Sequence, residues 1–308
     1  MGSKGYRLRW FENDADNALH HDLWFKLTRK LPRAQVRSLN SFRYKWPTGK
    51  FDPRSRIFAF DSEGNCIGCA GTAPGSEDFW TIDYPLLLKT HPDHIRSEMF
   101  EYLLGYATDH VEVPYLCQRF KEEWKSQIHF FKGYGFDEWF KVPIFSKKLE
   151  PFKDPVIKDK DFYQENGHAF SRMTDKDYLL LIDLSKRDVH GSIPYDEDTI
   201  NYLQSEFSES QFSWKVKNSN KVVGFFAVQI NWHQKNASIN SILVGQEDLE
   251  WQLFNFIHTR LAEKGIYEVY LSIFPDSKRI PFLLDSGYRP TSAEVYLNAS
   301  INNIKINR

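Results

Sequence analysis

The chain has 308 residues, 41% of them hydrophobic, 16% aromatic and 26% charged, with a formal net charge of −1. This length predicts two domains, because a single core rarely grows beyond about 250–300 residues. The balanced charge argues against nucleic acid as a partner. No stretch approaches the ~18 apolar residues of a membrane helix, and no targeting segment is apparent. The sequence therefore predicts a cytoplasmic protein that binds neither nucleic acid nor membrane.

The chain contains three cysteines, Cys66, Cys69 and Cys117. An odd and small number does not build a disulfide framework. Cys66 and Cys69 lie in a segment with strand character, where side chains three residues apart point to opposite faces. We therefore expect structural thiols and no metal site.

Strand and helix patterns alternate in the first half of the chain. Apolar spacing and the turn residues between the segments indicate their order. The predicted elements are strand 6–10, helix 14–31, strands 56–60, 66–72 and 78–88, helix 93–110, strand 113–120, helix 123–133 and strand 138–147. The turn 61–65, Asp-Ser-Glu-Gly-Asn, is typical of a β-hairpin.

The second half repeats this order after a charged stretch with two prolines, residues 151–167, which has the composition of a linker. The predicted elements are strand 168–173, helices from 174 and over 197–207, strands 212–217, 221–231 and 237–244, helix 246–264, strand 266–274, helix 278–286 and strand 293–299. Gly265 and Gly287 follow helices, as helix-terminating glycines do.

Two halves with one order of elements indicate an internal duplication. We therefore predict two tandem domains, 1–150 and 168–308, joined by the linker 151–167. Each should be an α/β domain with a mixed, mostly antiparallel central sheet flanked by helices.

Short motifs that occur in both halves of the chain are similar to those of a known protein family. A hairpin with a glycine in its second strand occurs at 61–68 and again at 217–225. A helix that ends in Gly followed by an aromatic residue occurs at 131–136 and at 283–288, and Pro92 precedes the helix that carries Leu103 and Leu104. In this order the chain resembles the GNAT superfamily of acyl-CoA-dependent N-acyltransferases, in a tandem form.

The resemblance implies acetyl-CoA or another acyl-CoA as co-substrate, with its diphosphate on backbone N–H groups where the helix after Pro92 begins. The implied cofactor-binding residues are Leu87, Leu88, Lys89, Asp93, His94, Ile95, Arg96 and Ser97. Glu98 and Phe100, however, stand where the family carries glycines. Two interpretations stay open: a distorted loop that still offers N–H groups beside Lys89 and Arg96, or a capped helix that no longer binds CoA.

The second half departs further from the family pattern, because residues 244–249 hold one glycine and two acids. This favours a structural pseudo-domain there.

The resemblance also implies catalytic groups. The family often uses a tyrosine on its last helix as proton donor, and Phe131 and Leu283 occupy that position here. Tyr134 is the candidate substitute, with core packing as its alternative role. Asp83, on a central strand, is the candidate base that accepts the proton of an attacking amine; the alternative is a solvated acid. Glu112 and Cys117 are weaker candidates.

The resulting hypothesis is an N-acyltransferase that moves an acyl group, acetyl in the first instance, from acyl-CoA to an amine of a small molecule or peptide. The missing glycines leave two alternatives. One is a degenerate GNAT-fold protein that serves in binding or as a scaffold. The other is a Fem-type transferase that uses aminoacyl-tRNA.

Overall fold

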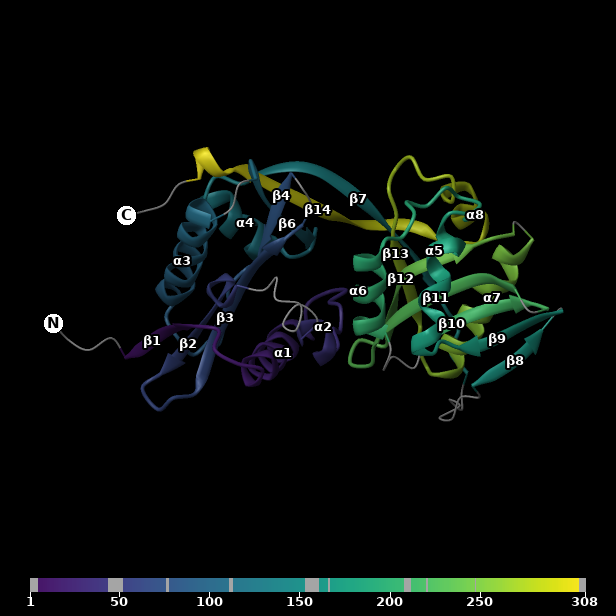
Figure 1. Cartoon of the computed structure of the whole chain (residues 1–308), viewed down its shortest axis with the longest axis horizontal. Coiled ribbons are helices and arrows are strands. Elements are labelled where there is room, and N and C mark those ends of the chain that lie inside the picture. The colour runs from purple at the N-terminus through teal and green to yellow at the C-terminus, as the bar shows by residue number, and fades with distance from the viewer. Residues whose placement is uncertain are drawn as a thin grey trace. The chain divides into compact units, whose positions relative to one another are not determined.

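The computed structural model describes residues 5–43, 52–75, 78–110, 113–152, 161–165, 167–207, 212–219, 221–246 and 248–304. The chain divides into two compact units (Figure 1). Unit 1 comprises residues 1–32, 42–141 and 294–308, and unit 2 comprises residues 33–41 and 142–293. Each unit therefore includes a segment from the opposite half of the chain.

Unit 1 contains a mixed sheet with the strand order β1-β2-β3-β4-β6-β14, and β5 adds to β3. Only the pair β4–β6 is parallel; the other neighbours described in this unit are antiparallel. The elements are β1 (Tyr6–Trp10), α1 (Ala15–Thr28), β2 (Arg56–Asp61), β3 (Cys66–Pro74), β4 (Phe79–Ile82), β5 (Leu86–Leu87), α3 (His94–His110), β6 (Tyr115–Lys121), α4 (Lys125–Gly133) and the C-terminal part of β14 (Arg289–Ser300).

Alternation along the strands of unit 1 gives the sheet two apolar faces. In β2, Ile57 and Ala59 join the cluster that contains the α3 residues Met99 and Phe100. Phe58, between them, joins the cluster on the α1 side. Successive strand residues point to opposite faces, so the sheet is covered by helices on both sides, as the α/β pattern predicts.

Unit 2 contains a second mixed sheet with the order β7-β13-β12-β11-β10-β9-β8, in which only β12–β13 is parallel. Its elements are the C-terminal part of β7 (Asp137–Lys148), β8 (Phe162–Glu165), β9 (His168–Arg172), α5 (Leu180–Ser185), α6 (Glu197–Phe207), β10 (Ser213–Asn218), β11 (Lys221–Asn231), β12 (Asn236–Val244), α7 (Leu249–Glu263), β13 (Glu268–Ser272), α8 (Ile280–Asp285) and the first part of β14. The short helix α2 (Leu39–Arg43) spans the boundary between the units.

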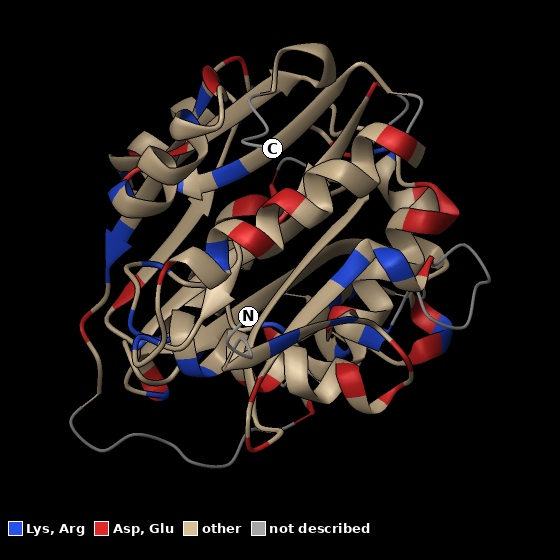
Figure 2. Ribbon diagram, turned by 90° about the vertical axis from the view of Figure 1, so that its left-hand side faces the viewer, with Lys and Arg blue, Asp and Glu red and all other residues tan. Residues whose placement is uncertain are grey.

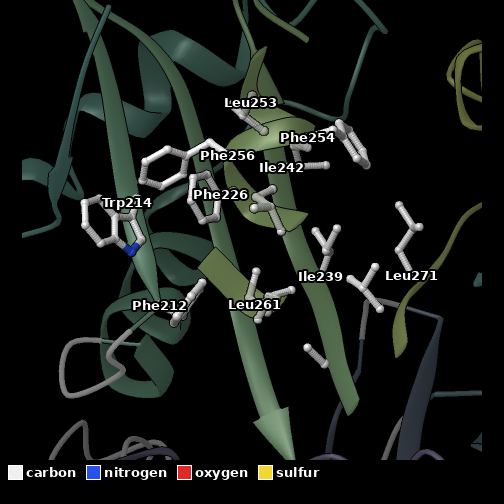
Figure 3. Packing of buried hydrophobic residues seen from close by; sticks show 14 of the residues in the cluster. Phe212, Trp214, Phe226, Ile239, Ile242, Leu253, Phe254, Phe256, Leu261 and Leu271 are labelled. Atoms are coloured by element: carbon white, nitrogen blue, oxygen red, sulfur yellow. The ribbon is translucent and has the colours of Figure 1, made fainter. Parts of the chain in front are cut away.

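Helix α7 fills one face of the unit 2 sheet with aromatic side chains (Figure 3). The Phe256 ring lies 4.2 Å from that of Phe170, centroid to centroid, and 5.3 Å from that of Trp214. Phe225 and Ala227 of β11 face the other way, in a cluster with residues of α5 and α6. Unit 2 thus repeats the two-sided helix cover of unit 1.

The predicted elements occur in the predicted order, but the short helix α2 was not predicted, and other details differ. The strand expected at 78–88 is interrupted between Ile82 and Leu86, and β8 lies inside the stretch expected as a linker. In the hairpin of β2 and β3, a register shift opposite Phe60 places Cys66 and Cys69 against one apolar cluster. The expectation that these two thiols face opposite sides was therefore wrong, because the bulge adds a residue between them.

Charged residues of both signs are interspersed along the helices and strands in the view of Figure 2. Within the part of the chain that the structure describes, no helix combines the length and the apolar character needed to cross a membrane.

One glycine in each unit allows a helix to pack closely on the sheet. A Cβ atom on Gly68 would lie 2.9 Å from the carbonyl oxygen of Leu86 and 2.9 Å from Cε of Met99 in α3. A Cβ atom on Gly224 would lie 2.9 Å from Cδ2 of Leu249 in α7. The two glycines of the hairpin motif therefore have the same structural role in both units.

We expect Gly68→Ala to lower the free energy of unfolding by about 1–3 kcal/mol, because the added methyl group overpacks the site. Gly224→Ala should cost less, since flexible side chains and not a backbone carbonyl surround it. Gly105→Ala in α3 is the control: nothing lies within 4 Å of its Cβ position, so it should raise stability by up to about 1 kcal/mol. Urea unfolding followed by circular dichroism measures all three, and a neutral Gly68→Ala would contradict the packing argument.

Candidate functional site

The parallel strands β4 and β6 of unit 1 separate after three residue pairs. Phe79, Trp80 and Thr81 pair with Tyr115, Leu116 and Cys117, and the described register ends there. The side chain of Gln118 donates a hydrogen bond of 2.8 Å to the carbonyl of Ile82, one step beyond the last pair. Strands that part leave main-chain groups on their inner edges for other partners, including an extended ligand.

A bulge occurs where the strands part. Ile82 is opposite Thr72 and Leu86 is opposite Cys69, so the three residues 83–85 face the two residues 70–71. The N–H of Asp83 donates to the carbonyl of Gly71 at 2.8 Å. A bulge of this kind redirects side chains and ends strand pairing, which accounts for the interruption of the predicted strand.

Unit 2 contains the same combination of bulge and parting strands. The parallel pairing of β12 and β13 runs from Asn236 to Ser238 and then ends. Ile239 and Ser241 oppose consecutive residues of β11, so Asn240 is the additional residue. Asn240 comes two residues after the last parallel pair, as Asp83 does after Thr81. The carboxylate of unit 1 is therefore replaced by an amide in unit 2.

Asp83 lies in a space that depends on Gly71. A Cβ atom on Gly71 would be 3.2 Å from Oδ2 of Asp83 and 3.3 Å from Cγ of Arg56. The guanidinium of Arg56 extends onward to the side chain of Asn17, at 2.5 Å, and the carbonyl of Phe42, at 3.1 Å. Gly71 thus makes room for a half-buried carboxylate at the bulge.

Arg96 connects the start of α3 to the bulge. Its Nε donates to the carbonyl of Pro85 at 3.2 Å, and its guanidinium carbon lies 5.2 Å from the centre of the Tyr84 ring. It also pairs with Asp93. Burial raises the pKa of Tyr84, and the charge of Arg96 opposes that shift. A cation is thus held beside the point where β4 and β6 part.

The first turn of α3 bonds to its own loop. The N–H groups of Ile95 and Arg96 donate to the carbonyls of Pro92 and Asp93 at 3.2 and 3.0 Å, and that of Ser97 donates to Asp93 at 3.3 Å. The other predicted cofactor-binding residues differ in exposure: Lys89, Asp93 and His94 are exposed, Leu88 is half-buried, and Leu87 and Ile95 are buried.

The negative charge of Glu98 is expected to disfavour the binding of a diphosphate. The side chain of Glu98, however, contacts a different element from the side chain of Arg96. Its carboxylate accepts a hydrogen bond from the hydroxyl of Tyr6 on β1. Two residues along a helix correspond to a rotation of about 200°, so Glu98 and Arg96 lie on opposite sides of α3. The unfavourable charge is therefore turned away from the bulge.

Tyr134 lies at the end of α4, with its ring 4.7 Å from that of Phe100 and 5.2 Å from that of Phe130. Its hydroxyl is 3.4 Å from a carboxylate oxygen of Glu101. Burial raises its pKa, so the phenol is protonated at neutral pH. The structure brings Tyr134 to α3, and the Phe130 ring contacts both Tyr134 and Tyr84, at 5.2 Å in each case.

The remaining candidates of unit 1 give no second site. Burial raises the pKa of the Cys117 thiol to about 11, which opposes the formation of a nucleophilic thiolate. Glu112 lies outside the described residues. Within those residues, no cluster of three His, Cys, Asp or Glu side chains could hold a metal ion.

The start of α7, the equivalent of α3 in unit 2, carries a buried ionic network. Glu250 accepts from Nε of Arg279 at 2.8 Å and contacts His190 Nε2 at 2.7 Å. Asp188 accepts from the N–H of Val244 at 2.7 Å and lies 3.5 Å from Arg279. A carboxylate thus occupies the helix start where an anion would bind. Sequence reasoning missed this network, because its members are up to 91 residues apart.

We expect Arg279→Met to lower the free energy of unfolding by about 3–5 kcal/mol, because it leaves two buried carboxylates without their cation. The side chains of Asp188, Glu250 and Arg279 are 0%, 5% and 6% exposed. Arg187→Met, at an exposed position, is the control and should stay within about 0.5 kcal/mol of the parent. Chemical denaturation of both variants tests this, and equal midpoints would contradict it.

Comparison with known proteins places this geometry in context. No family model and no curated protein matches the sequence. Among solved structures, the chain is similar to a tandem GNAT protein from the clavulanic acid biosynthesis pathway, with a TM-score of 0.62, 13% identity, and 96% of this chain and 99% of that chain covered.

Two further structures show the same likeness. N-myristoyltransferase from Saccharomyces cerevisiae with bound myristoyl-CoA gives a TM-score of 0.60 at 10% identity, covering 99% of this chain and 80% of that one. A GCN5-related N-acetyltransferase from Sphaerobacter thermophilus gives 0.56 at 13% identity, covering 98% and 97%. The chain therefore has the tandem GNAT fold, as its motifs predicted.

Proposed function

We propose that the protein is an N-acyltransferase that moves an acyl group, acetyl in the simplest case, from acyl-CoA to an amine of a small molecule or peptide. The observation that carries the proposal is the bulge of unit 1, where the strands part beside Asp83 and Arg96. The similar solved structures include N-acetyltransferases and an enzyme with bound myristoyl-CoA, which supports a thioester donor.

Unit 1 is the better candidate for the reaction, because unit 2 lacks two of the required features. Asn240 replaces Asp83, and an amide does not accept a proton at neutral pH. The negative charges of the buried Glu250 and Asp188 also disfavour the binding of a diphosphate at the start of α7. In unit 1, Arg96 supplies a positive charge near the start of α3, and the exposed Lys89 precedes this helix in the chain.

The proposed reaction is direct attack of the amine nitrogen on the thioester carbonyl carbon. The new C–N bond forms, the C–S bond breaks, and CoA leaves as a thiolate. Asp83 accepts the proton that the amine loses, directly or through water. Tyr134, whose phenol is protonated at neutral pH, is the proposed donor to the thiolate.

A binding or scaffold role is the second candidate. The observation that favours it is the closed first turn of α3, with amides bonded to Pro92 and Asp93 and with Phe100 fully buried behind it. Calorimetric titration separates the two: acetyl-CoA and myristoyl-CoA at near-millimolar concentration should release or absorb heat if the transferase proposal holds. Absence of heat with both would leave the scaffold role.

Arg96→Ala should weaken acyl-CoA binding about 10-fold, the effect of one lost charge-assisted contact. The matched control is Trp251→Ala, because Trp251 is the third residue of α7 as Arg96 is of α3. It should leave binding unchanged. Titration of both variants with acetyl-CoA measures the difference in affinity. If both variants bind acetyl-CoA more weakly to the same extent, the acyl-CoA site cannot be assigned to unit 1.

Asp83→Asn should bind acyl-CoA like the parent and lower turnover by about 10²–10⁴-fold, the contribution of a general base. Release of free CoA thiol with a panel of amines measures turnover. Asp183→Asn, which removes the same charge at an exposed position of unit 2, is the control and should keep parental turnover. Parental turnover in the Asp83 variant would contradict the role of Asp83 as the base.

A further inference from the structure

The N-terminal part of β7, residues 137–141, lies at an outer edge of the unit 1 sheet. One side of β7 pairs with β14, which pairs in turn with β6 (Figure 1), and the Phe140 ring stacks on Tyr296 of β14 with 4.3 Å between the centroids. The other side pairs with β13 only from Ile144 to Lys148. In the described part of the chain, no strand therefore covers the outer side of residues 137–141, and an open edge of this kind can pair with a further strand.

The direction of the main-chain groups at this edge follows from the C-terminal part of the same strand. In unit 2, the N–H of Ile273 donates to the carbonyl of Pro143 at 3.1 Å. Alternate residues of a strand direct their N–H and C=O groups to the same side. The main-chain groups of residues 137, 139 and 141 therefore point to the open side of β7, in the order that an antiparallel partner strand requires.

The side chains of these three residues share one face of the sheet and combine an aromatic ring with two opposite charges. Trp139 is 55% exposed. Asp137 is exposed and makes no ion pair with the described residues. Lys141 pairs at the surface with Glu122 at 3.1 Å and with Glu138 at 3.7 Å. Exposed ion pairs of this kind contribute little, so they leave Lys141 able to face a further carboxylate.

The order of these residues along β7 is complementary to itself. Antiparallel pairing of two copies about Trp139 places Asp137 of each copy opposite Lys141 of the other, and it places the two indole rings opposite each other at the centre. Opposite charges and aromatic rings in directly opposed positions stabilise a sheet. Parallel pairing in register would instead place Asp137 beside Asp137 and Lys141 beside Lys141. The antiparallel arrangement has the reciprocal contacts of a closed two-fold dimer.

The two end strands of the described strand order, β1 and β8, lack this complementarity. Antiparallel pairing of two copies of β1 about Leu8 would place Arg7 opposite Arg9, which is repulsive. Strand β8 contains one acid, Glu165, and no basic residue. The charges of residues 137–141 therefore favour a second copy of this edge over the other end strands.

We infer that residues 137–141 form a dimerisation edge, which pairs in antiparallel orientation with the same residues of a second copy of this chain. Asp137, Trp139 and Lys141 each exchange both main-chain hydrogen bonds with the opposite residue. The inference rests on the edge of β7 and does not require the transferase activity proposed above. Because a short strand pair is smaller than the interface of a permanent dimer, we expect a reversible dimer with a dissociation constant of about 10–100 µM.

Sedimentation velocity of the full chain, over about 1–500 µM, tests the dimer. We expect the average mass to rise with concentration from 36.4 kDa toward twice that value. Trp139→Ala should weaken dimerisation at least about 10-fold, because it removes both central rings. Phe162→Ala is the control: Phe162 on β8 is also 55% exposed, and its variant should dimerise like the parent. A mass that stays at 36.4 kDa, or equal weakening by both substitutions, would overturn the inference.

Exchange of the two charges tests the register of the strands. Asp137→Lys places lysine opposite lysine, and Lys141→Asp places aspartate opposite aspartate, so each variant alone should dimerise at least about 10-fold more weakly than the parent. An equimolar mixture of the two variants restores opposite charges at both ends and should dimerise again. Both positions are exposed, so both variants should fold, which circular dichroism verifies. A mixture that stays monomeric, or a single variant that dimerises like the parent, would contradict the antiparallel pairing.

Discussion

The combination of a one-residue bulge and a parting pair of parallel strands organises both units. Because the bulged strand runs directly toward the helix that follows it, the bulge determines which side chain lies at the opening and how closely the helix approaches. In unit 1 this position holds Asp83, and in unit 2 it holds Asn240. The same backbone therefore carries a carboxyl group in one unit and a neutral amide in the other.

The two units use the start of the equivalent helix in different ways. In unit 1 the positive end of α3 is accompanied by Arg96, which is supported by a carbonyl and an aromatic ring. In unit 2 the first turn of α7 carries the buried Glu250, which pairs with Arg279. A buried carboxylate in the first turn disfavours an external anion at that helix start. The transferase activity proposed above would therefore be confined to unit 1.

Periodicity predicted the elements and the duplicated order well, because strand alternation and helix caps are local properties of the sequence. The aromatic strand around Asp83 was visible as a strand, but its bulge was not, because only the register opposite residues 70–71 shows the additional residue. The ionic network around Arg279 joins segments up to 91 residues apart in the chain. No local pattern predicts such contacts.

The exchange of terminal strand segments has a consequence for how this chain can evolve. Residues 294–300 pair with β6, and residues 144–148 pair with β13, so each sheet is completed by a segment encoded in the other half of the gene. A fission of the gene near residue 150 would leave β6 with an unpaired edge, and exposed edges promote aggregation. The two copies can therefore diverge in chemistry, but they can no longer be inherited separately.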